Sequence, residues 1–319
     1  MKIVIPGGSG QVGTLLARKF AADGHDVVIL SRGGNATVGR GEHWDGKTLG
    51  DWAGAVDGSD VVINLAGRSV NCRYNEENRR QMMDSRVDST RVVGEAIAAA
   101  TSPPPVWLQA STATIYAHRF DEPNDDVDGI VGGNEPDAPD TWRFSIDVAT
   151  AWENAANTAD TPKTRKVLMR SAMVMSPDRG GIFDVMLGLV RKGLGGTAGS
   201  GRQYISWVHD KDFIRAVNWL IDHEDLSGPV NISSPNPLPN REFMHIFREA
   251  WGTRLALPAF EWQLAIGAFL MRTETELILK SRRVVPRLLT DSGFQFEYPE
   301  WKDAAADLVE RWRKTENEK

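Results

Sequence analysis

The feature that most constrains the fold is a glycine-rich turn near the start of the chain. An apolar run over residues 2–5 is followed by Pro6 and then by Gly-Gly-Ser-Gly-Gln-Val-Gly over residues 7–13. The run is typical of a buried strand, and apolar residues at helical spacing over residues 11–22 predict a helix directly after the turn. A strand, a glycine turn and a helix in this order predict a dinucleotide-binding unit of the Rossmann type.

Each glycine of this turn has a separate expected task. Gly7 permits the tight turn, Gly10 lets the backbone approach a pyrophosphate, and Gly13 lets the helix pack on the strand. The free N–H groups at the start of the helix favour an anion there. The predicted cofactor residues of the turn are Gly7, Ser9, Gly10, Gln11, Val12 and Gly13.

The second strand, predicted over residues 26–30, indicates which dinucleotide the site prefers. It ends in Leu30-Ser31-Arg32, whereas an NAD site usually places Asp or Glu there to hold the ribose 2′-hydroxyl. A carboxylate would repel a 2′-phosphate, and Arg32 can bind one through charge-assisted hydrogen bonds. NADP(H) is therefore favoured over NAD(H), and the alternative is that Arg32 is an ordinary exposed loop cation.

Strands and helices alternate along the first half of the chain. Further strands are expected at residues 60–65, 106–110 and 167–170, with helices near 49–56, 75–100 and 142–156. This alternation predicts an α/β fold, a doubly wound parallel sheet with a smaller, mostly helical C-terminal substrate domain. We expect a Rossmann domain of residues 1–175 plus about 204–232, with a return strand at 228–232, and a substrate domain of residues 176–203 plus 233–319.

Charge and composition narrow the function classes. The net charge of −6 offers no basic field for nucleic acid or an anionic membrane, and the one biased stretch, residues 121–140, has eight acidic residues and no Lys or Arg. We expect that stretch to be a loop, either a solvated insertion or a lid over the cleft. The basic residues Lys280, Arg282, Arg283 and Arg287 are expected to offset a helix dipole.

The cysteine count and the lack of a signal peptide or a long apolar run indicate where the protein is located. Cys72 is the only cysteine, so no internal disulfide can form, and no signal peptide or 18-residue apolar run is present. We expect a cytoplasmic protein without a membrane span or a metal site. The partners considered are a small-molecule substrate of unknown identity and a second copy of the chain in a homodimer.

Several further motifs resemble those of a known family. They are Asn64-Leu65-Ala66-Gly67, Ser111 to Tyr116, Asp84-Ser85-Arg86-Val87, Gly199 to Gln203 before Ser206-Trp207-Val208-His209, Arg283 to Leu289, and Gly293 to Phe296. They are similar to extended short-chain dehydrogenase/reductases, and more narrowly to the atypical sugar-nucleotide-epimerase-like branch with its own C-terminal domain. Some members of that branch carry a cell-division-inhibitor label. The resemblance covers nearly the whole chain and implies that Leu65, Ala66, Gly67, Arg86 and Thr112 approach the cofactor.

At the catalytic positions this sequence differs from the family that it resembles. In the superfamily a Ser or Thr acts with a Tyr-x-x-x-Lys pair, in which Tyr exchanges the proton and Lys lowers the pKa of Tyr and binds ribose. Thr112 matches the hydroxyl position, but Phe144 stands in place of Tyr and Val148 in place of Lys. Of the four tyrosines only Tyr298 has Lys four residues later, and Pro299 intervenes.

Three hypotheses remain open at this point. An enzyme could draw a different acid from Thr112, Tyr116 or His118; an enzyme could take the proton from water or substrate; or a non-catalytic protein could sense NADP(H) and signal through its C-terminal domain. Substrate contacts are expected from Arg73, Arg202, Trp207 and His209, although each has a structural alternative.

Overall fold

The centre of the protein is a seven-stranded parallel sheet. The structure is a computed structural model that describes residues 1–136, 138–253, 256–257 and 276–317. The strand order is β10-β6-β5-β4-β1-β2-β3, and every neighbouring pair is parallel. The strands are β1 (Lys2–Pro6), β2 (Asp26–Ser31), β3 (Arg40–His43), β4 (Val61–Asn64), β5 (Val106–Thr112), β6 (Arg165–Ser171) and β10 (Gly228–Ile232). This order confirms the predicted doubly wound sheet and its return strand.

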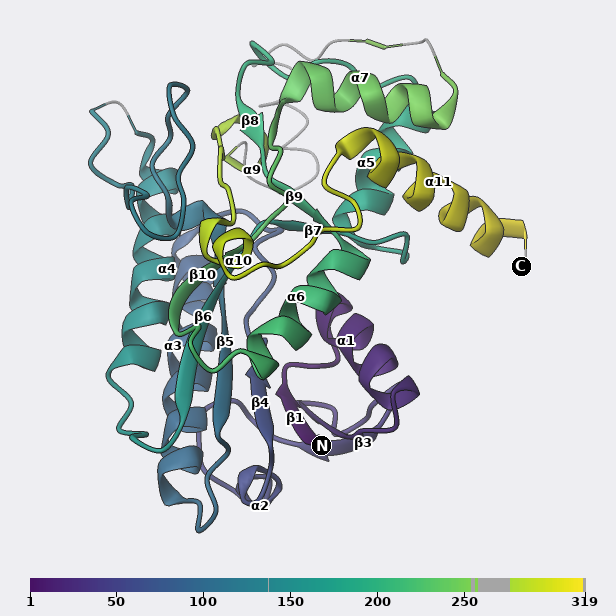
Figure 1. Cartoon of the computed structure of the whole chain (residues 1–319). Helices are drawn as coiled ribbons and strands as arrows, with labels where there is room; N and C mark the ends of the chain where they lie inside the picture. Colours follow the sequence, from purple (N-terminus) through teal and green to yellow (C-terminus); the bar gives the residue numbers. More distant parts are fainter. Residues whose placement is uncertain (137, 254–255, 258–275, 318–319) are drawn as a thin grey trace.

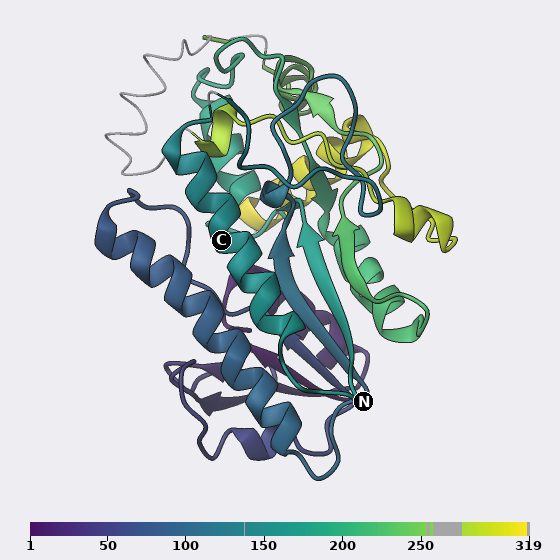
Figure 2. The ribbon, with the colours of Figure 1, turned by 90° about the vertical axis from the view of Figure 1, so that its left-hand side faces the viewer.

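Helices cover both faces of the sheet. Helices α3 (Glu76–Ala99) and α4 (Asp140–Asn157) run side by side over one face (Figure 2), and α1 (Gln11–Ala22) and α6 (Asp210–Asp222) lie on the other (Figure 1). Within β1, Ile3 and Ile5 pack into the core shared with α1 and α6, whereas Val4 packs into the core shared with α3. The strands are therefore apolar on both faces, as expected for a parallel sheet between two helical layers.

The C-terminal part has a core of its own beyond the carboxyl ends of the strands (Figure 1). Its helices are α5 (Ile182–Arg191), α7 (Asn240–Trp251), α9 (Glu276–Leu279), α10 (Arg287–Asp291) and α11 (Trp301–Asn317). Trp207, Phe243 and Trp301 are fully or almost fully buried at the centre of this core. The phenyl ring of Phe243 stacks on the indole of Trp301 with centroids 4.0 Å apart. Aromatic packing of this kind holds α7 and α11 together.

Two small sheets join this part to the Rossmann unit. Strand β7 (Met173–Met175) pairs in parallel with β9 (Trp207–His209), and β8 (Tyr204–Ile205) pairs antiparallel with β11 (Leu238–Pro239). Each has two or three residues, too few for a periodic sequence signal. The segment from residue 204 thus lies outside the seven-stranded sheet until β10, and the predicted domain boundaries stay a prediction.

Two local expectations differ from the structure. Strand β3 was not expected, because its sequence Arg-Gly-Glu-His has no apolar run; it forms an edge strand through its register with β2. The helix expected over residues 49–56 is reduced to α2 (Ala53–Val56), because the preceding residues 50–52 form turns in which the N–H of Ala53 donates to the carbonyl of Gly50. Tertiary pairing decided the first case and local turn geometry the second.

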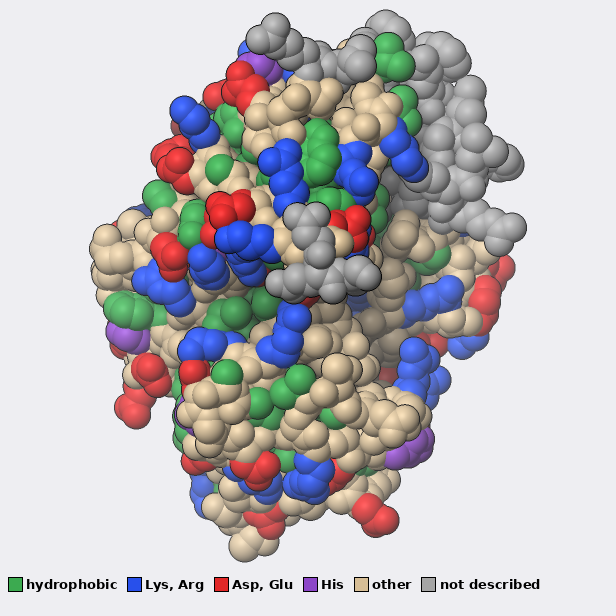
Figure 3. Space-filling model, turned by 90° about the vertical axis from the view of Figure 1, so that its right-hand side faces the viewer, with side chains coloured by type: hydrophobic (Ala, Val, Ile, Leu, Met, Phe, Trp, Pro, Cys, Tyr) green, Lys and Arg blue, Asp and Glu red, His purple; other side chains and the backbone are tan. Residues whose placement is uncertain are grey.

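The helices and the surface bear on whether the protein could span a membrane, hold a metal ion or bind a large anion. Among the described residues, none of the helices has the length and apolar character needed to cross a bilayer, and no cluster of three His, Cys, Asp or Glu side chains could hold a metal ion. On the described part of the face in Figure 3, basic and acidic side chains are interspersed. The cytoplasmic location and the homodimer stay predictions.

Candidate functional site

The glycine turn between β1 and α1 is packed so tightly that two of its positions exclude any side chain. Gly7 has a φ of +74°, and a Cβ there would lie 2.6 Å from the Cα of Ala66. A Cβ at Gly13 would lie 2.4 Å from the Cα of Gly8. At Gly10 the nearest atom would be the Gly7 carbonyl oxygen at 3.5 Å, so the protein does not crowd this position. Its backbone is therefore free to approach a ligand.

The first turn of α1 offers unpaired donors beside these glycines. Gly10 is the N-cap, no side chain caps the helix, and the first turn contains no acidic residue. The N–H groups of Gln11, Val12 and Gly13 have no acceptor within the helix, as at any helix start. Together with the helix dipole they form a site suited to a diphosphate.

Arg32 follows β2 at the same edge of the sheet. Its side chain is exposed, and its guanidinium forms no hydrogen bond or ion pair with the described part of the chain. The preceding Ser31 is committed to the loop, because its hydroxyl donates to the carbonyl of Asn35 at 3.1 Å. Arg32 is thus the cation available for a phosphate at the end of β2.

A cavity of about 390 Å³ lies beside the turn, where the parallel strands end. Leu65 after β4, Thr112 at the end of β5 and Ser171 at the end of β6 contribute to its wall, with Gln11 and Val12 from α1. Ligands of open α/β sheets bind at this edge, where the strand order reverses. The volume is in the range of small-molecule sites.

The predicted catalytic positions on β5 and α4 meet in this cavity. Thr112, Phe144 and Val148 all contribute to the lining. The Thr112 hydroxyl accepts from the N–H of Thr114 at 3.1 Å, which leaves its own proton free to point elsewhere. Phe144 and Val148 present only carbon atoms, so α4 supplies neither a proton nor a cation at these two positions.

Three buried donor side chains with few or no protein partners also line the cavity. Arg86 of α3 is 9% exposed; it donates to the Met82 carbonyl at 3.0 Å and forms no ion pair among the described residues. Its guanidinium lies 5.0 Å from the ring centroid of Trp152. Burial lowers the pKa of Arg86 to about 10, so the group stays charged at neutral pH. The buried Nε1 of Trp152 and Nε2 of Gln11 have no acceptor in the described part of the chain. Buried donors of this kind call for an acceptor on a ligand.

Tyr116, expected as an alternative acid, lies outside this cavity. Its hydroxyl donates to Oδ1 of Asn231 at 2.9 Å and accepts from Arg170 at 3.0 Å, and Arg170 in turn forms two 2.8 Å bonds to Glu153. Burial raises the pKa of Tyr116, partly opposed by Arg170. The hypothesis that Tyr116 supplies the proton has no support in this geometry, because buried protein groups occupy its hydroxyl.

His118 is likewise occupied elsewhere. Its Nδ1 accepts from the N–H of Ser281 at 2.8 Å, and its ring packs against Trp142 and Phe120. Burial lowers the pKa of His118. It does not contribute to the described lining of the cavity, so a catalytic role for it also lacks geometric support.

The four predicted substrate residues do not line the cavity among its described walls. Arg202 is exposed, with its guanidinium 5.5 Å from the Phe120 ring, and the fully buried Trp207 packs 5.0 Å from Trp301. Arg73 is half-buried next to the cavity residue Tyr74. A substrate role for these residues stays an untested prediction, and for Trp207 the structure shows core packing instead.

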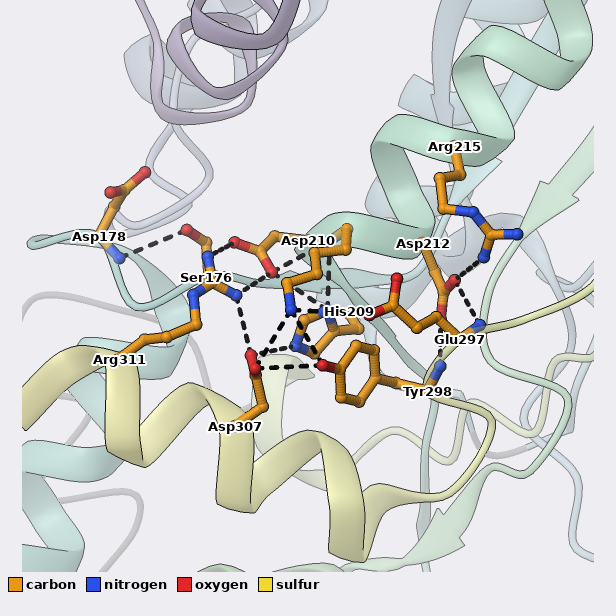
Figure 4. A network of polar contacts seen from close by, with 11 residues as sticks. Ser176, Asp178, His209, Asp210, Asp212, Arg215, Glu297, Tyr298, Asp307 and Arg311 are labelled. Carbon is orange, nitrogen blue, oxygen red and sulfur yellow. Dashed lines mark hydrogen bonds and ion pairs between the residues drawn. The ribbon is translucent and has the colours of Figure 1, made fainter.

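His209 belongs to a polar network that joins α6 to α11 (Figure 4). Its Nε2 lies 3.0 Å from Oδ2 of Asp307, and its ring stacks on Tyr298 at 3.9 Å. Arg311 forms paired bonds of 2.8 and 2.7 Å to Asp210 and a third of 3.0 Å to Asp307. Burial lowers the pKa of His209. The structure thus places His209 in an interface between the two parts of the chain rather than in the cavity.

The acidic segment 121–140 is anchored to the C-terminal segment by the basic cluster. Arg287 bonds the carboxylates of Asp125 and Asp128, and Arg283 bonds the carbonyl of Asp121 at 2.7 Å. The two oxygens of Asp126 accept the N–H groups of Asn231 and Leu288. Arg283 and Arg287 therefore bind this loop, while Lys280 and Arg282 bond Thr114 instead, which corrects the expectation of a helix-dipole role. None of the described loop residues up to 139 lines the cavity, so the lid hypothesis has no support.

Three polar side chains of the cavity were not expected from the sequence. Tyr74, Ser145 and Glu276 line it together, and the Ser145 hydroxyl donates to Oε2 of Glu276 at 2.6 Å. Ser145 also lies close enough to Tyr74 to lower the pKa of its phenol through hydrogen bonding. Since 131 residues separate Ser145 from Glu276, no local pattern could have revealed the contact.

Comparison with known proteins gives two family matches. Residues 3–233 match the NAD dependent epimerase/dehydratase family, and residues 258–308 match a domain of unknown function, DUF1731. Among similar proteins is the epimerase family protein ML0860 of Mycobacterium leprae, 31% identical over 93% of this chain and 92% of that protein. The epimerase family protein SDR39U1 of Mus musculus is 29% identical over 97% of this chain and all of that protein.

Solved structures show the same architecture. The human epimerase family protein SDR39U1, determined with NADPH, is 29% identical and superposes with a TM-score of 0.83 over 97% of this chain and 99% of that one. A nucleoside-diphosphate sugar epimerase from Corynebacterium glutamicum is 25% identical with a TM-score of 0.75, covering 99% of this chain and 61% of that one. The UDP-N-acetylglucosamine 4-epimerase of Bacillus cereus, 18% identical with a TM-score of 0.73, shares the fold.

Proposed function

Because this chain belongs to the NAD-dependent epimerase/dehydratase family, we propose that it binds NADP(H) and acts as an oxidoreductase- or epimerase-like enzyme without the usual Tyr-x-x-x-Lys pair. The observation that carries this proposal is the juxtaposition of the glycine turn, its free helix N-terminus and the cavity that holds Thr112. When bound, the cofactor would supply a hydride as NADPH or take one up as NADP⁺. The protein supplies the binding, the orientation and the proton.

The residues of the site fit such a cofactor. The turn at Gly10 leaves room for a diphosphate on the first N–H groups of α1, and the unpaired guanidinium of Arg32, at the end of β2, is available to bind a ribose 2′-phosphate. The structure of the human relative with NADPH supports the choice of NADP(H). Arg86, Gln11 and Trp152 offer buried donors whose desolvation a polar ligand in the cavity would offset.

A non-catalytic NADP(H)-sensing protein is the second candidate. The observation that favours it is that Phe144 and Val148 bring only hydrocarbon to the cavity, so proton transfer from these positions is impossible. In that case cofactor binding at α1 would be passed to the C-terminal part through neighbouring contacts such as Ile182 of α5 and Phe213 of α6, which also line the cavity.

Calorimetric titration of the purified protein with NADPH and NADH tests the binding proposal. We expect NADPH to bind at least about tenfold more tightly, because one charge-assisted contact is enough for that ratio. No heat with either dinucleotide, and no dinucleotide released on denaturation, would overturn it.

Single-turnover oxidation of bound NADPH then separates the two candidates. Carbonyl compounds that include sugar nucleotides, quinones and enones would be mixed with the NADPH complex and the absorbance at 340 nm followed. Oxidation with any of them supports the enzyme, and silence across all three classes favours the sensing protein.

A further inference from the structure

Tyr74 brings a phenol hydroxyl into the cavity from an unexpected element. It precedes α3, whose N-cap Asn75 accepts the N–H of Asn78, so the helix start holds the backbone of Tyr74 in place. The side chain is 9% exposed and lines the cavity with Thr112 and Phe144. Its ring meets the Phe144 ring edge-on, with centroids 5.5 Å apart and an angle of 72°. The phenol thus lies beside the position from which relatives are expected to present theirs.

A hydrogen-bonded chain leads away from this hydroxyl. Ser145 is close enough to the Tyr74 phenol to lower its pKa through hydrogen bonding, and Ser145 donates to the Glu276 carboxylate at 2.6 Å. Glu276 is 1% exposed, and Nη2 of Arg282 lies 3.9 Å from its other oxygen. Buried carboxylates are stable only with such partners. A phenol, a hydroxyl and a carboxylate in series form a path along which a proton can pass.

We propose that Tyr74 is the catalytic group that exchanges a proton with the substrate oxygen, and that Ser145 and Glu276 position it and relay the proton. The proposal rests on the proposed function, because NADP(H) must take up or supply the hydride. The substrate class that follows is a secondary alcohol or its carbonyl counterpart, bound in the cavity with its oxygen at Tyr74.

The step balances in both directions. In oxidation the substrate O–H proton passes to the Tyr74 oxygen, the Tyr74 proton to Ser145 and the Ser145 proton to Glu276. The substrate C–H bond breaks with its electron pair as a hydride to the nicotinamide, and the C=O double bond forms. In reduction the hydride adds to the carbonyl carbon, the C=O π bond breaks, and each proton moves back toward the substrate oxygen.

The surroundings of Tyr74 keep its phenol protonated at neutral pH. Burial first, and then the negative charge of Glu276, raise the pKa of Tyr74 to about 12, although the bond to Ser145 opposes this. The other groups that act on it are Arg282, which lowers its pKa, and Cys72; Arg86 also lies within electrostatic range. A phenol with this raised pKa is protonated at neutral pH but is a weaker acid than usual, so it donates its proton as hydride addition places negative charge on the substrate oxygen. In the family that this chain resembles, a lysine instead lowers the pKa of the tyrosine.

Fluorine NMR of the full chain carrying 3-fluorotyrosine tests the proposal without requiring turnover. The sequence has four tyrosines, so four resonances are expected, each assigned through its Tyr→Phe variant. We expect the Tyr74 resonance to move when NADPH is added and again when 9,10-phenanthrenequinone is added. Tyr204, whose ring lies 4.6 Å from the Arg283 guanidinium and does not line the cavity, is the control and should not move.

A pH titration of the same resonance tests the relay. Glu276→Gln removes the charge that raises the pKa of Tyr74, so the midpoint of the Tyr74 titration is expected to fall. Binding of NADPH with no response of the Tyr74 resonance to either ligand would overturn the catalytic role. An unchanged midpoint in Glu276→Gln would overturn the relay. If NADPH does not bind at all, the proposed function is wrong. The pH titration of Tyr74 would still test the relay in that case.

Kinetics provide a further readout with the same quinone as the probe. Tyr74→Phe is expected to lower kcat about 10²–10⁴-fold, the usual contribution of a positioned acid, with the Kd for NADPH within twofold of wild type. Ser145→Ala and Glu276→Gln should reduce kcat less and shift the pH dependence of kcat.

A rescue variant provides a second kinetic test. Phe144→Tyr together with Val148→Lys in the Tyr74→Phe background should recover part of the lost rate. A folded Tyr74→Phe protein that keeps the wild-type kcat would overturn the role. The resonance titrations decide the proposal even if this quinone is not turned over.

Discussion

The ring of Tyr74 meets the ring of Phe144 edge-on at a centroid distance of 5.5 Å, so an aromatic pair closes one side of the cavity. The guanidinium of Arg79 lies over the Phe144 ring, 4.8 Å from its centroid. Arg79 also bonds the backbone carbonyl of Tyr74 at 2.9 Å. These contacts at Phe144 bring the phenol ring of Tyr74 to the same wall of the cavity.

The substitution Gly13→Ala is expected to destabilise the protein and weaken NADPH binding. The added Cβ would lie 2.4 Å from the Cα of Gly8 and would push the turn away from its phosphate-binding shape. Overpacking of this kind costs about 1–3 kcal/mol. Thermal denaturation and NADPH fluorescence titration measure the two effects. In Gly54→Ala, the control in α2, the Cβ meets nothing within 4 Å. Wild-type affinity in Gly13→Ala would contradict the assignment of the turn.

The substitution Arg32→Ala is expected to weaken NADPH binding and leave NADH binding unchanged. A hydrogen bond to a charged group contributes about 1.5–3 kcal/mol, which corresponds to a loss of about 10- to 150-fold in affinity. Titration of both dinucleotides measures the ratio. Arg91→Ala in α3, where Arg91 pairs with Glu95 at 2.6 Å, is the matched exposed control. An equal loss for both dinucleotides would show that Arg32 does not read the 2′-phosphate.

The substitution Tyr116→Phe is expected to reduce stability without changing NADPH affinity. Its hydroxyl bonds Asn231 and Arg170 in a buried site, and the loss of one partner from buried polar groups costs about 1–3 kcal/mol. Urea denaturation gives the free energy of unfolding, and a cofactor titration gives the affinity. Lower affinity at full stability would restore Tyr116 as a site residue.

Asp307 is expected to contribute stability that is lost in acid. Burial alone would raise its pKa, but hydrogen bonds from Arg311 and Lys211 and the charge of Arg311 prevail and lower the pKa from 3.8 to about 2. A lowered pKa means that the stabilisation is fully present above 3.8 and disappears as the pH falls toward about 2. Urea midpoints measured between pH 6 and pH 2 should therefore fall less in Asp307→Asn than in wild type.

The control for this measurement is Glu310→Gln. Glu310 pairs with Lys314 on the exposed side of the same helix, and such a surface pair contributes little. Its acid profile should match that of wild type. Parallel profiles for wild type and Asp307→Asn would show that the contacts of Figure 4 do not depend on the charge of Asp307.

The sequence alone was sufficient for the strand, turn and helix at the start of the chain. The run from residue 2 to residue 13 predicts a strand, a glycine turn and a helix, because each depends on local backbone geometry and on apolar periodicity. The position of Arg32 at the end of β2 also follows from its own segment. Phe144 and Val148 line the cavity, which agrees with their alignment to the family positions. These residues are placed by elements that form from their own segment.

Tertiary structure decided which side chains share the cavity and which are committed elsewhere. Tyr116 lies only two residues beyond the cavity residue Thr114, yet its hydroxyl bonds Asn231, which is 115 residues away. Tyr74, Ser145 and Glu276 meet only after α3, α4 and α9 have packed together. A local sequence pattern predicts which side of a helix or strand is buried. A contact between distant segments depends instead on how the helices and the sheet pack together. For that reason the sequence predicts the dinucleotide turn, and the fold alone reveals the chain of hydroxyls beside it.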